Sequence, residues 1–406
     1  MEANSSSAEV PSHVPAELVF DFRFEKLPGV DFDPVQAAAD AGRKMPDIFF
    51  GLGSRKGSGA WVLTRHELQR EVLQDGATFS SHNNADFSIL LGEDWPLLPL
   101  NVDGAEHLEW RKLLNPIFSP ANMAKLETEI EALARELVSG FAAKGHVDFM
   151  KEFGSIFPVQ IFLKMFGLPL EHARMFIGWS DLLAHGQNMA ERIDGARQIA
   201  TYLRKKIAER TAEPTNDLIS YVVTAQVYGR GLTEDEKIGV CFLLYAAGLD
   251  TVANMLGFIF KYLAEHPEQQ QLLRNDRSLI PNAVEELMRA FPIIITGRLV
   301  TRDIDFHGVQ MKKGDTVCTA TPLAGRDARE FPDPDRIDFT REKVSHISFA
   351  AGPHRCIGSH LARRELKIAI EIWLDQIPPF RIADGQRAVT SGLNVLAVDK
   401  LPLAWS

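Results

Sequence analysis

The sequence predicts a mainly α-helical fold with one long central helix and small antiparallel β-sheets. Apolar residues recur at helical spacing in five separate segments. Residues 240–260 are apolar almost throughout, with Asp250 as their single charge. Between residues 300 and 321, short apolar and polar runs alternate around Gly308 and Gly314, which is typical of hairpin strands.

In chain order, residues 1–16 are rich in Ser, Ala and Pro and are expected to form a disordered tail. Residues 61–63 follow a glycine-rich turn and predict a strand. Helical periodicity covers residues 106–118, 125–141, 195–211, 280–291 and 359–377. No internal repeat and no Pro/Gly/Ser linker is evident, so residues 17–406 are expected to form a single large domain.

The central helix has clear ends. Thr233 and Glu236 have the spacing of a capping box, and a His-Pro pair follows Glu265. The apolar stretch is also long enough to span a bilayer, which needs about 20 residues. However, an acid such as Asp250 at the midpoint of a bilayer span is costly. A helix buried in the centre of a large protein is therefore favoured.

The composition excludes several classes of protein. The 44 Lys+Arg and 54 Asp+Glu give a net charge of −10, which argues against nucleic-acid binding. A hydrophobic content of 45% excludes a wholly disordered chain. Three scattered cysteines cannot form a disulfide framework. With no signal peptide evident at the start, we expect a cytoplasmic protein that does not bind membranes.

Two short motifs do not support their usual functions. Gly51, Gly53 and Gly57 lack the spacing of a dinucleotide-binding loop, and a strand-like AWVL follows where a helix is needed, so they predict a turn. His354, Cys356 and His360 are too few for a structural zinc site. A Cys-His nucleophile pair would need the fold to bring the two side chains together, commonly with a third group to orient them.

The surroundings of Cys356 indicate another role. Phe349, Gly352, Cys356 and Gly358 form the pattern F-x-x-G-x-x-x-C-x-G directly before a helix. The helix N-terminus would stabilise a thiolate, the glycines would let backbone approach a flat ligand, and Phe349 would cover the sulfur. These are the requirements of an axial ligand to haem iron. Cysteines without such surroundings, Cys241 and Cys318, are expected to be ordinary buried thiols.

The cysteine loop resembles the haem-binding signature of the cytochrome P450 superfamily, with Ala350 where a glycine is common. Three further motifs are similar to the family's and occur in the same order: His107-x-x-x-Arg111, Ala247-Gly248-Leu249-Asp250-Thr251 and Glu286-x-x-Arg289. The resemblance implies a large single-domain P450 fold, haem b ligated by Cys356, and monooxygenase activity with O2.

The resemblance also implies roles for individual residues. Asp250 would relay protons and Thr251 would hydrogen-bond the reacting dioxygen, beside a groove at Gly248. The Thr251 hydroxyl can equally bond back to the carbonyl of Ala247, and both can hold. Glu286 and Arg289 would pair and brace the cysteine loop. The side chains that would compensate the haem propionates are His107, Arg111, Arg298 and His354.

No flavin or nicotinamide site is found, so the electrons are expected from an iron–sulfur ferredoxin with its NADH-dependent reductase. The docking surface would be a basic patch made by Arg111, Lys112, Arg355 and Arg363. The protein is expected to act as a monomer.

For the substrate, residues 306–315, 343–349, 360–366 and 401–405 resemble the bacterial camphor-hydroxylating branch. Trp95 stands where that branch has a tyrosine that hydrogen-bonds the camphor ketone, and Asp86 stands where it has a phenylalanine. An indole is bulkier and can donate one hydrogen bond but accept none, which disfavours camphor. Together with Leu243, Ala246, Ile294 and Val395, an apolar pocket would suit another small hydrophobic substrate, of terpenoid or norisoprenoid type.

Two alternatives stay open. One is a peroxide-using haem-thiolate enzyme, and the other is a haem-thiolate sensor or carrier without catalysis. The presence of Asp250 and Thr251 disfavours both, since neither function needs a relay that delivers protons to dioxygen.

Overall fold

The computed structural model describes residues 10–55, 58–82, 87–186, 188–392 and 395–406. The chain forms two compact units, each assembled from three separate stretches. Unit 1 comprises Met1–Asn84, Pro281–Cys356 and Ala388–Asp399, and unit 2 comprises Ala85–Ile280, Ile357–Arg387 and Lys400–Ser406. Segments far apart in sequence therefore build each unit. The single domain expected over residues 17–406 stays a prediction.

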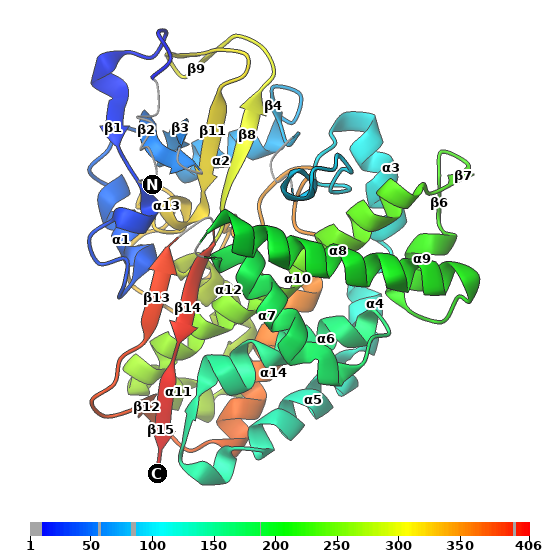
Figure 1. The fold of residues 1–406 in the computed structure, drawn as a ribbon. Helices are drawn as coiled ribbons and strands as arrows, with labels where there is room; N and C mark the ends of the chain where they lie inside the picture. Colours follow the sequence, from blue (N-terminus) through cyan, green and yellow to red (C-terminus); the bar gives the residue numbers. More distant parts are fainter. Residues whose placement is uncertain (1–9, 56–57, 83–86, 187, 393–394) are drawn as a thin grey trace. The chain divides into compact units, whose positions relative to one another are not determined.

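Unit 1 is organised around a six-stranded sheet in the order β1-β2-β3-β11-β8-β4 (Figure 1). Its strands are β1 (Val19–Asp21), β2 (Ile48–Arg55), β3 (Ser58–Leu63), β4 (Phe79–Ser80), β8 (Ile295–Val300) and β11 (Thr316–Ala320). The pairs β1–β2 and β3–β11 are parallel and the others are antiparallel. One face buries apolar side chains such as Trp61 and Val317, which are paired across β3 and β11.

The remaining elements of unit 1 are short. The helices are η1 (Ala16–Leu18), η2 (Phe24–Lys26), α1 (Pro34–Gly42), α2 (His66–Gln74), α12 (Ile280–Ala290, whose first residue ends a unit 2 stretch) and α13 (Thr321–Gly325). Two hairpins are formed by β9 (Ile304–Phe306) with β10 (Val309–Met311) and by β13 (Val389–Gly392) with β14 (Leu396–Lys400).

The sheet predicted between residues 300 and 321 is confirmed only in part. β9 and β10 form the expected antiparallel hairpin around His307 and Gly308, whose φ angles of 51° and 84° suit a two-residue turn. The following strand, β11, instead joins the larger sheet and runs parallel to β3. Local alternation predicts a strand but does not specify which distant strand it pairs with.

Unit 2 is mostly helical. Its α-helices are α3 (Gly104–Leu114), α4 (Pro120–Lys125), α5 (Glu127–Ser139), α6 (Ile156–Met165), α7 (Ala173–His185), α8 (Met189–Ala212), α9 (Leu218–Thr224), α10 (Glu234–Glu265), α11 (Pro267–Asn275) and α14 (Ser359–Gln376). Shorter helical turns are η3 (Ser88–Leu91), η4 (Ala142–Lys144), η5 (Met150–Gly154), η6 (Leu170–His172) and η7 (Arg277–Leu279). The strands are β5 (His146–Asp148), β6 (Gln226–Val227), β7 (Arg230–Gly231), β12 (Phe380–Ile382) and β15 (Pro402–Trp405).

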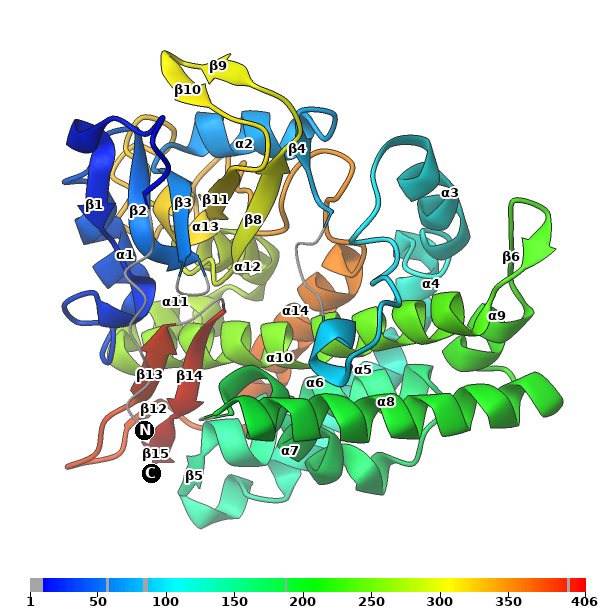
Figure 2. The same ribbon diagram turned by 45° about the horizontal axis from the view of Figure 1, so that its top comes forward.

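Helix α10 is the long central helix that the sequence predicts. The Thr233 hydroxyl accepts the backbone N–H of Glu236, and the Glu236 carboxylate accepts that of Thr233, which completes the capping box. By length and composition alone α10 could cross a bilayer. Most of its residues are nevertheless buried, and it packs against α6, α7, α8, α9 and α14 (Figure 2). This arrangement confirms the buried core helix.

The other predicted helices are present with shifted ends. The segments predicted at 280–291 and 359–377 correspond to α12 and α14 within one residue, whereas that at 125–141 is divided into α4 and α5 near Leu126. The turn predicted at Gly51 and Gly53 is not formed, because both residues lie within strand β2, whose register with β3 is irregular between Gly51 and Arg55. A strand therefore stands where a dinucleotide-binding loop would be needed. Gly57 lies outside the described residues.

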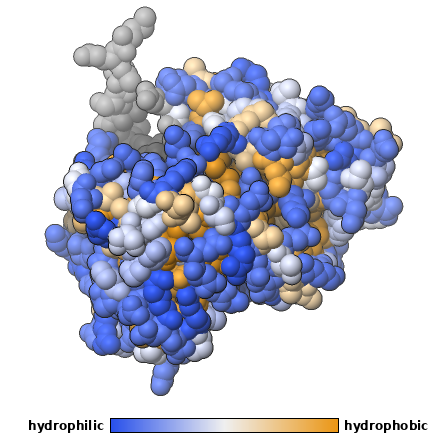
Figure 3. Space-filling model, turned by 90° about the horizontal axis from the view of Figure 1, so that it is seen from below, coloured by the Kyte–Doolittle hydropathy of each residue, from blue (hydrophilic) through white to orange (hydrophobic). Residues whose placement is uncertain are grey.

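Part of the segment expected to be a disordered tail packs on unit 1. Residues 1–9 lie outside the described part, but Val14 is buried in the core of unit 1 and His13 contacts Asp315 at 2.8 Å. Val10 packs against the same core, so residues 10–14 contact unit 1 through apolar and polar side chains. The face of the molecule in Figure 3 is mostly hydrophilic, with smaller hydrophobic areas between the polar side chains.

We predict that Gly239→Ala lowers the thermal midpoint and the soluble yield strongly. A Cβ at Gly239 of α10 would lie 1.9 Å from the carbonyl oxygen of Pro96, and backbone cannot yield as a flexible side chain can. In a solvent-exposed helix, a change from Gly to Ala stabilises the fold by about 1 kcal/mol. Gly231→Ala, where nothing lies within 4 Å, is the control. A Gly239→Ala protein as stable as the parent would contradict this close approach.

Candidate active site

Cys356 lies at the end of a turn that closes on its own backbone. Its N–H donates to the carbonyl oxygen of Phe349 at 2.9 Å, and the N–H of Arg355 donates to that of Gly352 at 3.1 Å. The Cys356 side chain is exposed, and α14 begins three residues later at Ser359. The turn therefore presents a thiol at an accessible position just before a helix.

The other two cysteines are buried, as the sequence predicts. Burial raises the pKa of the Cys241 thiol to about 12, so it stays protonated at neutral pH. Cys318 is enclosed in the core of unit 1 within β11. Across the described residues, no three His, Cys, Asp or Glu side chains gather as possible ligands of a metal ion. Among the cysteines, Cys356 is thus the accessible ligand.

Two residues give the cysteine turn its shape. Gly352 has φ 68°, and a Cβ there would lie 2.5 Å from the carbonyl oxygen of Leu73. Ala350 has φ 59°, in the left-handed region where a side chain is strained, which explains why glycine suits this position. Gly358 caps α14 with φ −78°, a conformation open to any residue. The turn therefore depends on Gly352 and tolerates Ala350 at a cost.

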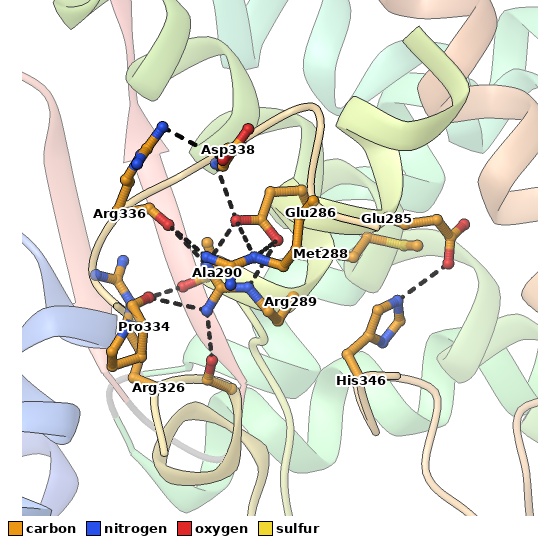
Figure 4. A network of polar contacts seen from close by, with 12 residues as sticks. Glu285, Glu286, Met288, Arg289, Ala290, Arg326, Pro334, Arg336, Asp338 and His346 are labelled. Atoms are coloured by element: carbon orange, nitrogen blue, oxygen red, sulfur yellow. Dashed lines mark hydrogen bonds and ion pairs between the residues drawn. The ribbon is translucent and has the colours of Figure 1, made fainter. Parts of the chain in front are cut away.

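Helix α12 holds the segment that leads into this turn. The Ser348 hydroxyl donates to the carbonyl oxygen of Met288 at 2.7 Å. The His346 ring contacts the Glu285 carboxylate at 3.2 Å (Figure 4). Sequence reasoning missed these four residues. Two signals were available: Glu285 and Met288 are immediate neighbours of the E-x-x-R pair on α12, and His346 and Ser348 lie in the segment 343–349.

The predicted pair of Glu286 and Arg289 is present and fully buried. Arg289 donates from Nε and Nη2 to the two carboxylate oxygens at 2.8 and 2.9 Å (Figure 4). Glu286 also accepts the backbone N–H of Asp338 and the guanidinium of Arg341. Arg289 further donates to the carbonyl oxygens of Gly325, Pro334 and Arg336. The pair thus holds the segment 325–341, while its neighbours on α12 hold the cysteine segment.

The middle of α10 is more open than its ends. Most of residues 246–252 keep accessible surface, in contrast to the buried residues on either side. The Thr251 hydroxyl donates to the Ala247 carbonyl oxygen at 2.9 Å, and the Asn254 amide donates to the Asp250 carboxylate at 2.9 Å. These bonds fix an acid and an alcohol on an accessible turn. At Gly248, an added Cβ would meet the Phe162 ring at 3.4 Å.

The basic residues that the resemblance assigns to the haem propionates lie in both units. In unit 2, His107 of α3 is almost fully buried, and Arg111 donates to the Asn115 side chain at 2.8 Å. In unit 1, Arg298 of β8 is also buried, with 4% of its surface exposed. His354 of the cysteine turn is half-buried. Each unit therefore offers basic groups at low exposure.

The single donor of Trp95 is engaged. Its indole N–H donates to the Glu93 carboxylate, a partner that sequence reasoning missed. The ring is 3% exposed and packs against Phe242 of α10, with ring centroids 5.1 Å apart. Trp95 is therefore held as an apolar wall, with its donor already engaged.

The other predicted pocket residues form two groups. Leu243 and Ala246 are half-buried and lie on the same side of α10, three residues apart. Ile294 and Val395 of unit 1 are paired by an isolated antiparallel β-bridge, although they are 101 positions apart in the chain (395 − 294). Asp86 lies outside the described residues.

Comparison with known proteins agrees with this geometry. The family model for cytochrome P450 matches residues 160–376. A protein described as "Probable cytochrome P450 127A1" from Sinorhizobium fredii is 40% identical over 403 residues, covering 98% of this chain and 97% of its own length. The vitamin D3 dihydroxylase of Streptomyces griseolus is 30% identical and covers 86% of this chain and 88% of its own.

Solved structures give the same result. The crystal structure of cytochrome P450 CYP101C1 has a TM-score of 0.88 at 33% identity, and it covers 98% of this chain and 100% of its own. That of CYP101J2 has a TM-score of 0.87 at 34% identity with the same coverage. The chain belongs to the cytochrome P450 family and has the P450 fold. It is a haem-thiolate monooxygenase, a class that binds protoporphyrin IX through a cysteine thiolate.

The side chains present fit this cofactor. Haem needs an accessible thiolate, a face of small side chains and basic groups for two carboxylates. Unit 1 supplies an exposed Cys356 and a buried Arg298. Unit 2 supplies the open, small-residue turn at 246–248 and a buried His107. These side chains are of the kinds that could ligate the iron and compensate the carboxylates of the cofactor.

We predict that Ala350→Gly stabilises the cysteine turn by roughly 1 kcal/mol, the cost of a left-handed alanine less the extra flexibility of glycine. Gly352→Ala is the opposite test, because it adds both strain and contact with the Leu73 carbonyl oxygen. Thermal midpoints and haem content of the purified proteins measure both effects. Equal midpoints for Gly352→Ala and the parent would contradict the turn geometry.

Proposed function

We propose that Cys356 ligates the haem iron and that the enzyme hydroxylates a small apolar substrate with O2. The observation that carries this proposal is the exposure of Cys356 on a turn closed by the Phe349 carbonyl, while both other cysteines are buried. Carboxylates of the cofactor would be held by His107, Arg111, Arg298 and His354. When bound, the haem supplies the iron at which dioxygen is activated.

Asp250 and Thr251 are proposed to hold the protons that dioxygen cleavage consumes. The Thr251 hydroxyl donates its proton to Ala247, so its lone pairs remain available to accept a hydrogen bond from a protonated group. The Asn254 amide fixes the orientation of the Asp250 carboxylate. An acid and an alcohol at neighbouring positions can pass a proton without opening the site to bulk water.

The proposed substrate is a small hydrophobic molecule of terpenoid or norisoprenoid type. Trp95, Leu243, Ala246, Ile294 and Val395 contribute apolar surface, which favours recognition by shape. Electrons are proposed to come from an iron–sulfur ferredoxin and its NADH-dependent reductase. Its docking would use exposed or half-exposed basic side chains, namely Arg111, Lys112, Arg355 and Arg363.

The ligand assignment is tested by the absorption spectrum of the reduced, CO-bound protein. We expect a Soret band well to the red of that of a histidine-ligated haem, retained in Cys318→Ala and lost in Cys356→Ala. Circular dichroism shows whether each variant is folded. A spectrum typical of a histidine-ligated haem in the unmodified protein would contradict the proposal. Substrates are then found by screening terpenoids for a low- to high-spin shift.

The proton role is tested by Thr251→Val, which keeps the shape of the side chain and removes the hydroxyl. We expect product formed per NADH consumed to fall strongly, because loss of a positioned proton-transfer group slows its step by roughly 100-fold or more. Thr251→Ser keeps the hydroxyl and is the matched control. If Thr251→Val couples as well as the parent, the hydroxyl only bonds back to Ala247 within α10.

A further inference from the structure

The Glu93 carboxylate joins two side chains that are far apart in sequence. Arg204 of α8 donates to it through both terminal nitrogens, with Nη1 3.1 Å from Oε1. The indole N–H of Trp95 donates to the other carboxylate oxygen. These hydrogen bonds, first that of Arg204 and then that of Trp95, lower the pKa of Glu93, so it is ionised at neutral pH.

The ring of Trp95 lies close to the accessible turn of α10. It packs against Phe242, and Phe87 contacts the same ring with centroids 5.5 Å apart. Phe242 is one turn before Ala246 and two turns before Asp250, so all three share one face of the helix. The backbone next to Trp95 is also docked, because Gly239 lets the Pro96 carbonyl approach α10.

We propose that Glu93 is a positioning residue that keeps the single donor of Trp95 away from the substrate. The pocket would then bind an apolar substrate by shape and gain nothing from a carbonyl near the indole. An indole has one N–H, and a hydrogen bond to a carboxylate is roughly twice as strong as one to a neutral oxygen. A ketone cannot compete with Glu93 for that donor. The inference rests on the proposed function, because it treats ligands as substrates.

Removing the carboxylate reverses this preference. In Glu93→Leu, the indole N–H of Trp95, a residue that is 3% exposed, loses its charged acceptor, which favours any ligand oxygen that can reach it. Arg204 is 46% exposed and can return to solvent, so it does not compete. We expect the affinity for a ketone, relative to a hydrocarbon of the same skeleton, to rise roughly tenfold.

The experiment compares dissociation constants for camphane and camphor, which differ only by the ketone, measured by the spin-state shift of the holoenzyme. The camphor-to-camphane ratio is expected to be the same in the parent, in Trp95→Phe and in Arg204→Gln. It rises in Glu93→Leu and returns to the parent value in the double variant Glu93→Leu/Trp95→Phe. Glu93→Gln keeps an acceptor oxygen but loses the charge, so its ratio is expected to lie between those of the parent and Glu93→Leu.

A ratio that falls in Trp95→Phe alone would overturn the proposal, since the indole would then be donating to the ketone in the unmodified protein. A rise in Glu93→Leu that persists in the double variant would overturn it as well. If Glu93→Leu does not fold, Glu93→Ala provides the same comparison.

A second readout does not depend on the haem or on substrate. With ¹⁵N-labelled indoles, Trp95→Phe identifies the Trp95 N–H resonance. We expect the indole proton of Trp95 to exchange slowly with solvent in the parent and in Glu93→Gln. We expect the chemical shift of its resonance to change in Glu93→Leu. If no terpenoid in the spin-state screen binds, the proposed substrate class fails, whereas an unchanged indole resonance in Glu93→Leu overturns the role of Glu93. The two failures are therefore distinguishable.

Discussion

Much of unit 2 depends on one constraint on α10, which must bury apolar surface along most of its length and still leave one turn accessible. Near its ends, large side chains such as Phe242 and Phe260 pack against neighbouring elements. In the middle, residues 246–248 are Ala, Ala and Gly. Small side chains bury little area, so an accessible turn forfeits little of the apolar stabilisation of roughly 25 cal/mol per Å². The helix can thus be a core element and a ligand-facing element at once.

Features determined by residues a few positions apart could be predicted from the sequence. The capping box at Thr233 and the pairing of Glu286 with Arg289 both follow from helical spacing of three residues. The cysteine turn was identified in the same way, and the structure adds the reason for its glycines. Gly352 is required by its φ and by the Leu73 carbonyl, whereas Gly358 has an unrestricted φ.

Contacts between distant residues could not be predicted, because a charged side chain carries no local mark of its partner. Glu93 and Arg204 are 111 positions apart, and each resembles any other surface charge in the sequence. Trp95 is one example: the residue type shows that the side chain carries a single N–H donor, but not that this donor is bound to Glu93. The parallel pairing of β11 with β3 is a similar case, in which alternation indicates a strand without its neighbour.

The close approach of Pro96 to Gly239 has a consequence for how this enzyme can diversify. Because the backbone is docked at that point, the side chains just before it can change without moving the chain that carries them. Substitution at the part-exposed Glu93 would change the polarity of the surface there, whereas substitution at Trp95 would also lose its packing on Phe242. The backbone contact therefore holds this segment on α10 whichever side chain stands at position 93, so mutation can explore that position while the fold is kept.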